Sequence, residues 1–483
     1  MTSYPAESRL TDGTGGRHLD LATALGLTPG GPVDNPVFFS GFLTRPDVAA
    51  AGLLAVADVA AHRYADAGLG HRLANLDPVV TAGGDRLRFE SFSACNGVHA
   101  RFDLLRPALG SAEVGFGTTN VDVNLALRTA LARVSRDQPL HLSVGSDELR
   151  ASSLAGTHVE RKVRLPERWI RGFAEVPALT RSMTRAGELR GAAVTRFLAG
   201  LPRVAPPGPT RYVLTDGPRW RMSHRPIAGA VPLPGASRLR AADRVARHAT
   251  ALTVYVAPNE TAAWVFDLAD ARLTLVISPD PYRGFSGEGT LLTLLTHPDG
   301  EQVGRRLLPH LDWSPVIEPT ELTARAGLSA SAAAVGLAWL AASGRLGWDL
   351  TESAWFHREL PIDTERIVRR NPRLVSAQAL VADDGVSPRG AGWQVRGSER
   401  EHYLVTPDLT CDCAWYRDHP GTTRGPCTHV LAAVIAARCT TDDPGQAVAG
   451  TPPPAAAPGP RPAPAPPALS AECHNSSPPS RVT

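Results

Sequence analysis

The sequence predicts a multidomain α+β protein, and three observations support this fold class. The 483 residues allow two to four domains of roughly 100–200 residues each. Apolar residues make up 43% of the chain and charged residues 20%, values that exclude a wholly disordered chain, a collagen and a coiled coil. Short apolar runs typical of strands alternate with runs of helical period over the first 360 residues.

The N-terminal part of the chain is expected to hold a flexible arm and a large mixed α/β region. Residues 1–36 are polar and rich in glycine, which predicts the arm. Residues 37–205 form the predicted α/β region. Its first helix opens at Pro46 and Asp47, because both residue types suit a first helical turn. Apolar residues between 180 and 201 recur at helical spacing and predict another helix.

Two further regions follow. Residues 206–316 are expected to be β-rich, because runs such as LTVYVA, AWVFDLA and RLTLVIS combine β-branched, aromatic and other apolar residues, with one short helix near 239–250. Residues 317–360 predict a short helix, a turn, a second helix N-capped by Ser329 and two extended pieces. This order resembles a winged helix and so implies nucleic-acid contact. Packing without such contact is the simpler interpretation, since small helical hairpins are common.

The C-terminal tail, the apolar runs and the N-terminal residues indicate where in the cell the protein is expected. Residues 443–483 contain the run TPPPAAAPGPRPAPAPPALS, which has too few large apolar residues to bury, and we expect a disordered tail. No apolar run reaches the ~20 residues that a bilayer span needs. The first residues lack a basic stretch followed by an apolar core. We therefore expect a cytoplasmic protein with no membrane partner.

A cluster of cysteines predicts a metal site. Cys411 and Cys413 are spaced so that an extended segment places both thiols on one side, and Cys427 and His429 directly precede the apolar run VLAAVIAA. Three thiolates and one imidazole form a closed tetrahedral shell, which is typical of one structural Zn²⁺ and leaves no position for a reactive water. His419 is a rival ligand, but its surroundings predict an exposed turn.

This spacing is similar to the signature of the SWIM zinc-finger family, which is Cys-x-Cys, a variable gap and Cys-x-His. The segments WQVRGS (393–398) and YLV (403–405) resemble the strand pair that precedes the ligands in that family, and we expect strands over 374–382 and 392–405. The resemblance covers residues 372–440 and implies a small ββα zinc finger. It also implies a bacterial protein whose finger binds DNA or a protein partner. The ligands it implies are Cys411, Cys413, Cys427 and His429.

Arginine-rich stretches are candidate phosphate contacts. Residues 201–250 contain nine Arg and two Asp without Glu or Lys, and Tyr212 and Trp220 lie among them. A solvated face that pairs with acidic residues elsewhere is the competing interpretation. A smaller cluster, which includes Arg373, lies just before the finger. The candidate nucleic-acid contacts are Arg219, Arg221, Arg238, Arg240, Arg369 and Arg370.

Catalytic patterns are weak, and we expect no enzyme. Cys95 and His99 would lie about 13 Å apart on a strand, too far for a nucleophile and its base. The glycine-rich turn at 283–289 matches neither the Walker A pattern nor the dinucleotide fingerprint. The sequence thus predicts a zinc-binding nucleic-acid module. The alternatives are an adaptor that recruits a protein such as an ATPase, or an unrecognised enzyme in the N-terminal region. No small-molecule substrate is indicated.

Overall fold

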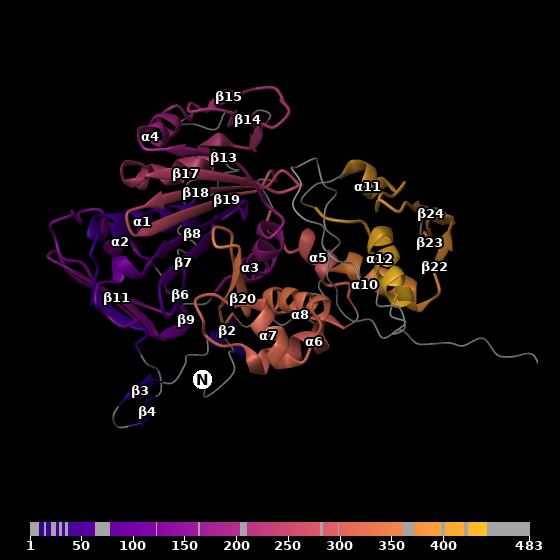
Figure 1. Cartoon of the computed structure of the whole chain (residues 1–483), viewed down its shortest axis with the longest axis horizontal. Helices are drawn as coiled ribbons and strands as arrows, with labels where there is room; N and C mark the ends of the chain where they lie inside the picture. The colour runs from indigo at the N-terminus through magenta and orange to yellow at the C-terminus, as the bar shows by residue number, and fades with distance from the viewer. Residues whose placement is uncertain are drawn as a thin grey trace, which may run out of the picture.

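The structure of the chain is a computed structural model (Figure 1). It describes residues 37–62, 78–121, 123–162, 165–202, 210–280, 284–297, 299–360, 371–397, 401–419 and 424–441. In the expected N-terminal arm it describes two backbone hairpins, β1 (Arg9–Gly13) with β2 (Gly16–Asp20) and β3 (Gly26–Thr28) with β4 (Gly31–Val33). The expected disordered tail at 443–483 lies outside the described residues.

An eight-stranded antiparallel sheet forms the centre of a mixed α/β structure. Its strand order is β13 (Thr184–Arg190), β17 (Ala251–Val256), β18 (Ala262–Leu268), β19 (Ala271–Ile277), β8 (Val98–Leu104), β7 (Leu87–Phe92), β6 (Val79–Gly83) and β9 (Phe116–Asn120). The expected regions 37–205 and 206–316 therefore contribute strands to one sheet, joined where β13 pairs with β17 and where β19 pairs with β8.

One face of the sheet is apolar and is covered by α1 (Pro46–Ala61). Alternate residues such as Leu87, Phe89 and Phe102 point to this face and pack with the helix in one core. Nearly every residue of α1 is buried, as its apolar run on all sides predicts. Gly52 lets the helix approach the sheet, since a Cβ there would lie 2.1 Å from the Phe102 ring.

The other face of the sheet carries charge at its centre. Here α3 (Glu167–Thr180) packs beside a hairpin of β20 (Leu346–Asp349) and β21 (Ala354–His357). The second set of alternating residues on β7 and β8 meets this hairpin and is fully buried. These residues are Arg88, Glu90, His99, Arg101 and Asp103.

Two smaller sheets flank the central one. The first has the order β12 (Gly156–Arg161), β11 (Glu148–Ser153), β10 (His141–Val144), β5 (Phe39–Phe42), and α2 (Leu125–Leu131) lies between it and α1. The second has the order β15 (Arg221–Ser223), β14 (Arg211–Leu214), β16 (Val231–Leu233). The helix expected over 180–201 is wrong in its first half: β13 pairs there with β17, and only α4 (Ala192–Ala199) is helical. The short helix expected near 239–250 is two 3₁₀ helices, η2 (Ala236–Arg244) and η3 (Ala246–His248).

Residues 300–357 form a helical group that ends in the β20–β21 hairpin. The helices are α6 (Gly300–Leu307), α7 (Pro319–Ala326) and α8 (Ala330–Ala342), and Ser329 caps α8 as expected. Within the part of the chain that the structure describes, no single helix is long and apolar enough to cross a bilayer; α7 and α8 reach that length and composition only as a pair, with a bend of 106°.

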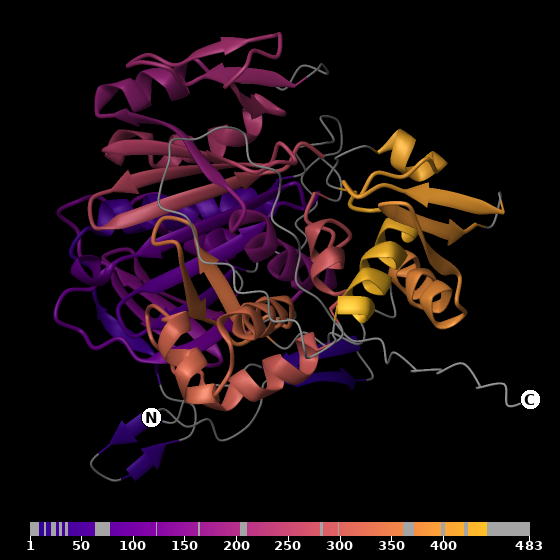
Figure 2. The same cartoon turned by 45° about the vertical axis from the view of Figure 1, so that its right-hand side comes forward.

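The C-terminal elements lie to one side of the central sheet, next to α5 (Thr290–Leu294) (Figures 1 and 2). They are α10 (Pro372–Ala382), the antiparallel sheet β22 (Val386–Arg389), β23 (Gly392–Arg396), β24 (His402–Val405), and then α11 (Ala414–Asp418) and α12 (Thr428–Thr441). The strand expected over 374–382 is wrong, because Asn371 caps a helix there and Pro372 occupies its first turn.

Candidate metal centre

The C-terminal unit, residues 372–441, is called the finger. Cys411 and Cys413 lie where its chain passes from the sheet β22–β24 into a helix. Val405, at the end of β24, forms an antiparallel bridge with Cys411. The turn between them is closed by hydrogen bonds between Thr406 and Thr410. Cys413 caps α11, and its Sγ accepts a hydrogen bond from the backbone N–H of Tyr416 at 3.4 Å. Both thiols are therefore fixed by local backbone structure.

Cys427 and His429 lie at the beginning of α12. The Sγ of Cys427 accepts a hydrogen bond from the backbone N–H of Val430 at 3.4 Å. The ring of His429 stacks on that of Tyr403, with centroids 4.2 Å apart. Because the first N–H groups of a helix lack partners within the helix, this position suits a sulfur atom that accepts a hydrogen bond from one of them.

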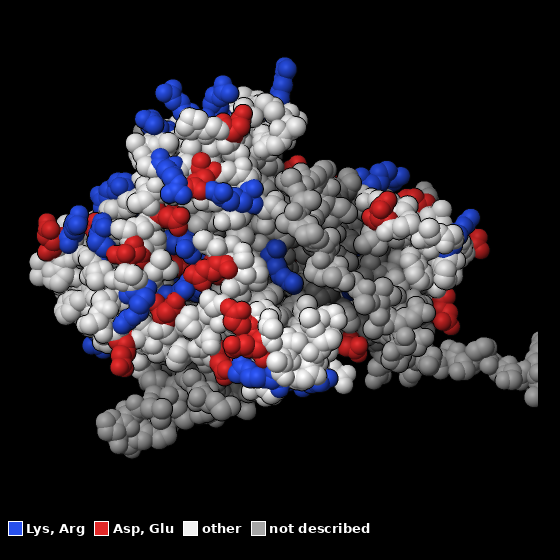
Figure 3. All heavy atoms as spheres, viewed as in Figure 1, with Lys and Arg blue, Asp and Glu red and all other residues white. Residues whose placement is uncertain are grey.

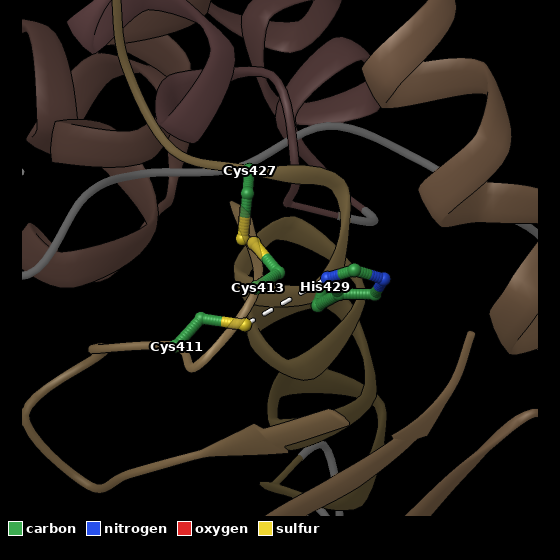
Figure 4. A group of neighbouring side chains, drawn as sticks. All are labelled: Cys411, Cys413, Cys427 and His429. Carbon is green, nitrogen blue, oxygen red and sulfur yellow. Dashed lines mark hydrogen bonds between the residues drawn. The ribbon is translucent and has the colours of Figure 1, made fainter. Parts of the chain in front are cut away.

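The four side chains converge into one group (Figure 4). One ligand atom from each residue lies within 4.8 Å of all the others, and Cys411 Sγ is 3.7 Å from His429 Nδ1. The three cysteines are less than 8% exposed. A tetrahedral ion with metal–sulfur bonds of about 2.3 Å needs ligand atoms about 3.8 Å apart. The group therefore fits one metal ion with small side-chain shifts, and the four ligands predicted from the sequence are the ones brought together.

The Cys411 and Cys413 thiols are held in their neutral form when no cation is present. A hydrogen bond with Cys427 and burial raise the pKa of the Cys411 thiol to about 12. Burial also raises the pKa of the Cys413 thiol. A bound cation supplies the positive charge that three neighbouring thiolates need, so metal binding here releases protons.

His419, the rival ligand, lies outside this group. Its ring stacks on Trp415 with centroids 4.4 Å apart, and its Nδ1 is 3.1 Å from the Trp415 backbone oxygen. The Trp415 indole N–H points instead to the carbonyl of Gly425, at 3.4 Å. His419 thus packs on Trp415 of α11 and does not join the ligand group.

Arg373 holds the segment that carries Cys427, a role that the sequence does not indicate. Its Nη1 donates hydrogen bonds to the backbone oxygens of Arg424 at 2.8 Å and Pro426 at 2.7 Å. Its guanidinium lies 4.4 Å from the centre of the Trp415 ring. The expectation that Arg373 belongs to a phosphate-contacting cluster is wrong, because these carbonyls and this ring surround its guanidinium.

The finger rests on the turn that precedes α5. Arg373 Nη2 also donates a hydrogen bond to the backbone oxygen of Glu288 at 3.2 Å. Gly425 approaches the same residue, and its φ is +69°. A Cβ at Gly425 would lie 2.3 Å from the Glu288 carbonyl oxygen, so glycine is required on both counts. Residues 284–289 of the glycine-rich turn thus support the finger.

Glu175 fixes this supporting turn from inside the core, and it makes stability depend on pH. It is fully buried and accepts hydrogen bonds from the backbone N–H of Leu291, at 3.2 and 3.4 Å. Burial raises the pKa of Glu175 to about 7. Since the folded state binds this proton more tightly than the unfolded state, the contribution of Glu175 is greatest below about pH 4.5 and is lost as the pH rises to about 7.

Replacing Glu175 by glutamine is expected to remove that part of the pH dependence. Between pH 4.5 and pH 8 the free energy of unfolding of the variant should rise relative to the wild type, by at most about 3 kcal/mol. Denaturant unfolding at both pH values measures this difference. Other titrating groups contribute equally to both proteins, so parallel pH profiles would contradict the assignment.

Among the described residues, the arginines predicted to contact nucleic acid do not form one surface. Arg219 and Arg221 are exposed on the β14–β15 hairpin. Arg238 is only 4% exposed and donates a hydrogen bond to the backbone oxygen of Ser278 at 2.8 Å, so it is unavailable to a partner. Arg240 is half-buried and pairs with Asp243 at 2.5 Å. Arg369 and Arg370 lie outside the described residues.

Trp220, considered as a residue that stacks on a base, and Cys95, considered as a nucleophile, are also buried. Trp220 is 8% exposed and packs against Phe197 and Trp264, so it offers no face to a base. The Cys95 thiol lies 3.4 Å from Ser93 Oγ, whereas His99 Nε2 lies 3.3 Å from Glu90. Each group thus has its own partner within the core.

Comparison with known proteins places the chain in no family. No protein-family model matches it, and no curated protein sequence matches it. Solved structures with similarity include the proliferating cellular nuclear antigen of Entamoeba histolytica, at 10% identity and a TM-score of 0.34, covering 51% of this chain and all of that one. The PCNA2–PCNA3 complex of Sulfolobus tokodaii is similar at 9% identity and a TM-score of 0.38, covering 50% of this chain and 99% of that one.

Proposed function

We propose that the protein is a zinc-containing nucleic-acid-binding protein, in which the metal is structural. Three thiolates and one imidazole are the donor set that zinc takes in closed sites, and four protein ligands leave no position for a substrate. The SWIM-type spacing of these ligands supports the same assignment. The ion ties the sheet of the finger, through Cys411 and Cys413, to the start of α12.

The observation that carries nucleic-acid binding is a surface of unpaired arginines on the β14–β15 hairpin. Arg219, Arg221 and Arg225 are exposed there, and none of them forms an ion pair with a described residue. Arg196 of the neighbouring α4 is exposed as well. Figure 3 shows basic side chains gathered over α4, β14 and β15 with few acidic ones among them. Such a surface suits the regularly spaced charges of a phosphate backbone.

The proposal assigns no groove contact to α8. The order α6, α7, α8, β20, β21, with Ile317 bridging Trp355 of the hairpin, resembles that of a winged helix. A winged helix would insert its second motif helix into the major groove. Here α8 packs against α3 and α5, so that face is covered. Packing is therefore the role we assign to this segment.

Replacing Arg219 and Arg221 together by serine is expected to weaken DNA binding uniformly across sequences. Each lost phosphate contact removes one released counterion, so the slope of log K against log salt should become less steep by about 1.8. Fluorescence anisotropy with a labelled duplex at several salt concentrations measures the slope. Arg133 and Arg136, exposed in the segment that follows α2, form the matched control pair.

Equal slopes for the two double variants would overturn the assignment of this surface. A wild-type protein that binds neither duplex nor single-stranded DNA at low salt would overturn nucleic-acid binding altogether. In that case the alternative hypothesis would apply, in which the protein is a metal-stabilised adaptor that binds a protein partner through the finger.

A further inference from the structure

The loop between β15 and β16, residues 224–230, exposes apolar side chains beside the arginine surface. Pro226, Ile227 and Ala228 are all exposed to solvent, and Ile227 is 46% exposed. The apolar residues of the neighbouring strands behave differently, since Val213 of β14 and Val231 of β16 are buried in the main core. A single exposed apolar residue is common on protein surfaces, so the surroundings of Ile227 decide its role.

Hydrogen bonds hold this loop in one shape. Ser223 Oγ accepts a hydrogen bond from the backbone N–H of Arg225 at 3.0 Å and donates one to the carbonyl oxygen of the same residue at 2.9 Å. The backbone N–H of Ala230 donates to the carbonyl oxygen of Ile227 at 3.0 Å, which closes a tight turn. Gly229 in that turn has a φ of +77°, which glycine adopts without strain. Ile227 is therefore presented by an ordered loop, and little ordering entropy opposes its insertion into a partner.

The charged residues of the surrounding segment are all basic. Arg225 lies two positions before Ile227, and Arg221 begins the preceding strand. Residues 217–242 contain five arginines and neither aspartate nor glutamate, so no carboxylate of this segment neutralises the charge beside Ile227. The partner that fits is therefore anionic and also offers an apolar space that one side chain can enter.

Duplex DNA combines these two properties, because its phosphates are anionic and its stacked bases part to admit an apolar side chain. Proteins that bind the minor groove frequently combine arginine with an isoleucine, leucine or proline that wedges into a base step. The 224–230 loop also lacks the asparagine, glutamine and acidic side chains that read the major groove. An anionic membrane fits less well, because one aliphatic side chain without phenylalanine or tryptophan beside it buries little surface there.

We propose that the 224–230 loop enters the minor groove of duplex DNA, wedges Ile227 into a base step and bends the duplex. This inference rests on the proposed nucleic-acid function and adds the way in which the DNA is held. Arg225 lies in the groove beside the wedge, and Arg219 and Arg221 contact the flanking phosphates. Because opening a base step costs free energy, the protein favours DNA in which that cost is already lowered, such as a nicked duplex or a flexible pyrimidine–purine step.

Fluorescence energy transfer between dyes at the two ends of a duplex of about 30 base pairs tests the bend, with the full chain as the protein. We expect the wild type to bring the duplex ends closer together, and to bind a centrally nicked duplex about tenfold more tightly than an intact one. Ile227→Ser should leave the bound duplex straight and should lose the preference for the nick. Its salt slope should equal that of the wild type, since no phosphate contact is lost.

Two further variants show whether the effect belongs to the wedge. Ile227→Leu keeps an aliphatic side chain and should retain the bend. Leu154→Ser is the matched control, because it removes a side chain that is 73% exposed on the β11–β12 hairpin, and it should bend DNA as the wild type does. Since both positions are exposed, these substitutions should leave the fold intact, which circular dichroism checks.

The outcomes separate this inference from the function on which it rests. A straight duplex bound to the wild type, or an unchanged bend in Ile227→Ser, would overturn the wedge and leave phosphate binding by the arginines in place. Absence of any DNA binding by the wild type would overturn both. Sedimentation with phosphatidylserine-containing vesicles covers the other anionic partner: vesicle binding that Ile227→Ser removes, in a protein that does not bend DNA, would assign the loop to a membrane and overturn the wedge.

Discussion

Replacing Cys427 by serine is expected to abolish metal binding and unfold residues 372–441, while the central sheet stays folded. Cys427 is 1% exposed at the start of α12, and the residues of that helix that follow it are buried against α10 and the finger sheet. Structural zinc contributes apparent binding free energies of about 10–16 kcal/mol in zinc-finger peptides. The core between α1 and the sheet lies in a separate apolar cluster and does not depend on the ion.

Metal content by mass spectrometry and limited proteolysis measure the two effects. The wild type should carry about one zinc ion per chain, and Cys413→Ser should lose it as Cys427→Ser does. Cys95→Ser is the matched control, because Cys95 is a buried thiol outside the metal-ligand group. Protease resistance of the finger in Cys427→Ser, or a folded wild type without metal, would refute the structural role of the ion.

Replacing Glu90 by glutamine is expected to destabilise the protein by about 3–5 kcal/mol, because it leaves a fully buried cation without its counter-ion. Arg358 is 1% exposed and donates two hydrogen bonds to the Glu90 carboxylate, at 3.0 and 3.2 Å. Burial alone would raise the pKa of Glu90, but the charge of Arg358 holds it well below its usual range. The pair links β7 of the sheet to the end of the β20–β21 hairpin.

Glu352→Gln provides the matched control. Glu352 pairs with Arg86 where the same hairpin meets the central sheet, but its side chain is 27% exposed. Removing its charge should therefore lower the free energy of unfolding by about 1 kcal/mol or less. The double variant Glu90→Gln, Arg358→Met removes both charges and should recover most of the loss. Denaturant unfolding compares the three variants with the wild type. Equal costs for the two single variants would show that burial does not set the strength of this contact.

The metal ligands could be predicted from the sequence because their signal is local. Cys411 and Cys413 lie close together in one segment, and Cys427 and His429 lie close together in the next, so the sequence alone shows the two segments that a metal ion would join. Arg373 could not be predicted in this way. Its partners are backbone carbonyls of residues 288, 424 and 426, which carry no mark in the sequence.

Secondary structure was predicted wrongly where a distant partner or a helix cap decided the outcome. The apolar spacing before Leu201 suits a helix, yet residues 184–190 extend because the edge of β17 offers them hydrogen bonds. In α10 only Leu374 and Ala377 are buried, three residues apart on one helical face, and the cap at Asn371 fixes its start. Apolar content alone does not distinguish these cases.

The burial of charged residues on one face of the central sheet could not be predicted from the sequence for a related reason. Alternation in LRFESF and VHARFDL indicates strands, and their charged positions would ordinarily face water. The hairpin that covers them comes from residues 346–357, more than 240 positions later. Only the tertiary structure shows that Arg88 pairs there with both Asp103 and Asp349.

The pairing of β19 with β8 also sets an order of events during synthesis. β8 ends at Leu104 and its partner β19 ends at Ile277. At about 5–20 residues per second, a ribosome needs roughly 10–30 s to make the intervening chain. During that interval β8 presents an open, partly apolar edge, of the kind that pairs with other chains. The nascent protein is therefore most exposed to aggregation in this window, and a chaperone that shields this edge would act between these two points.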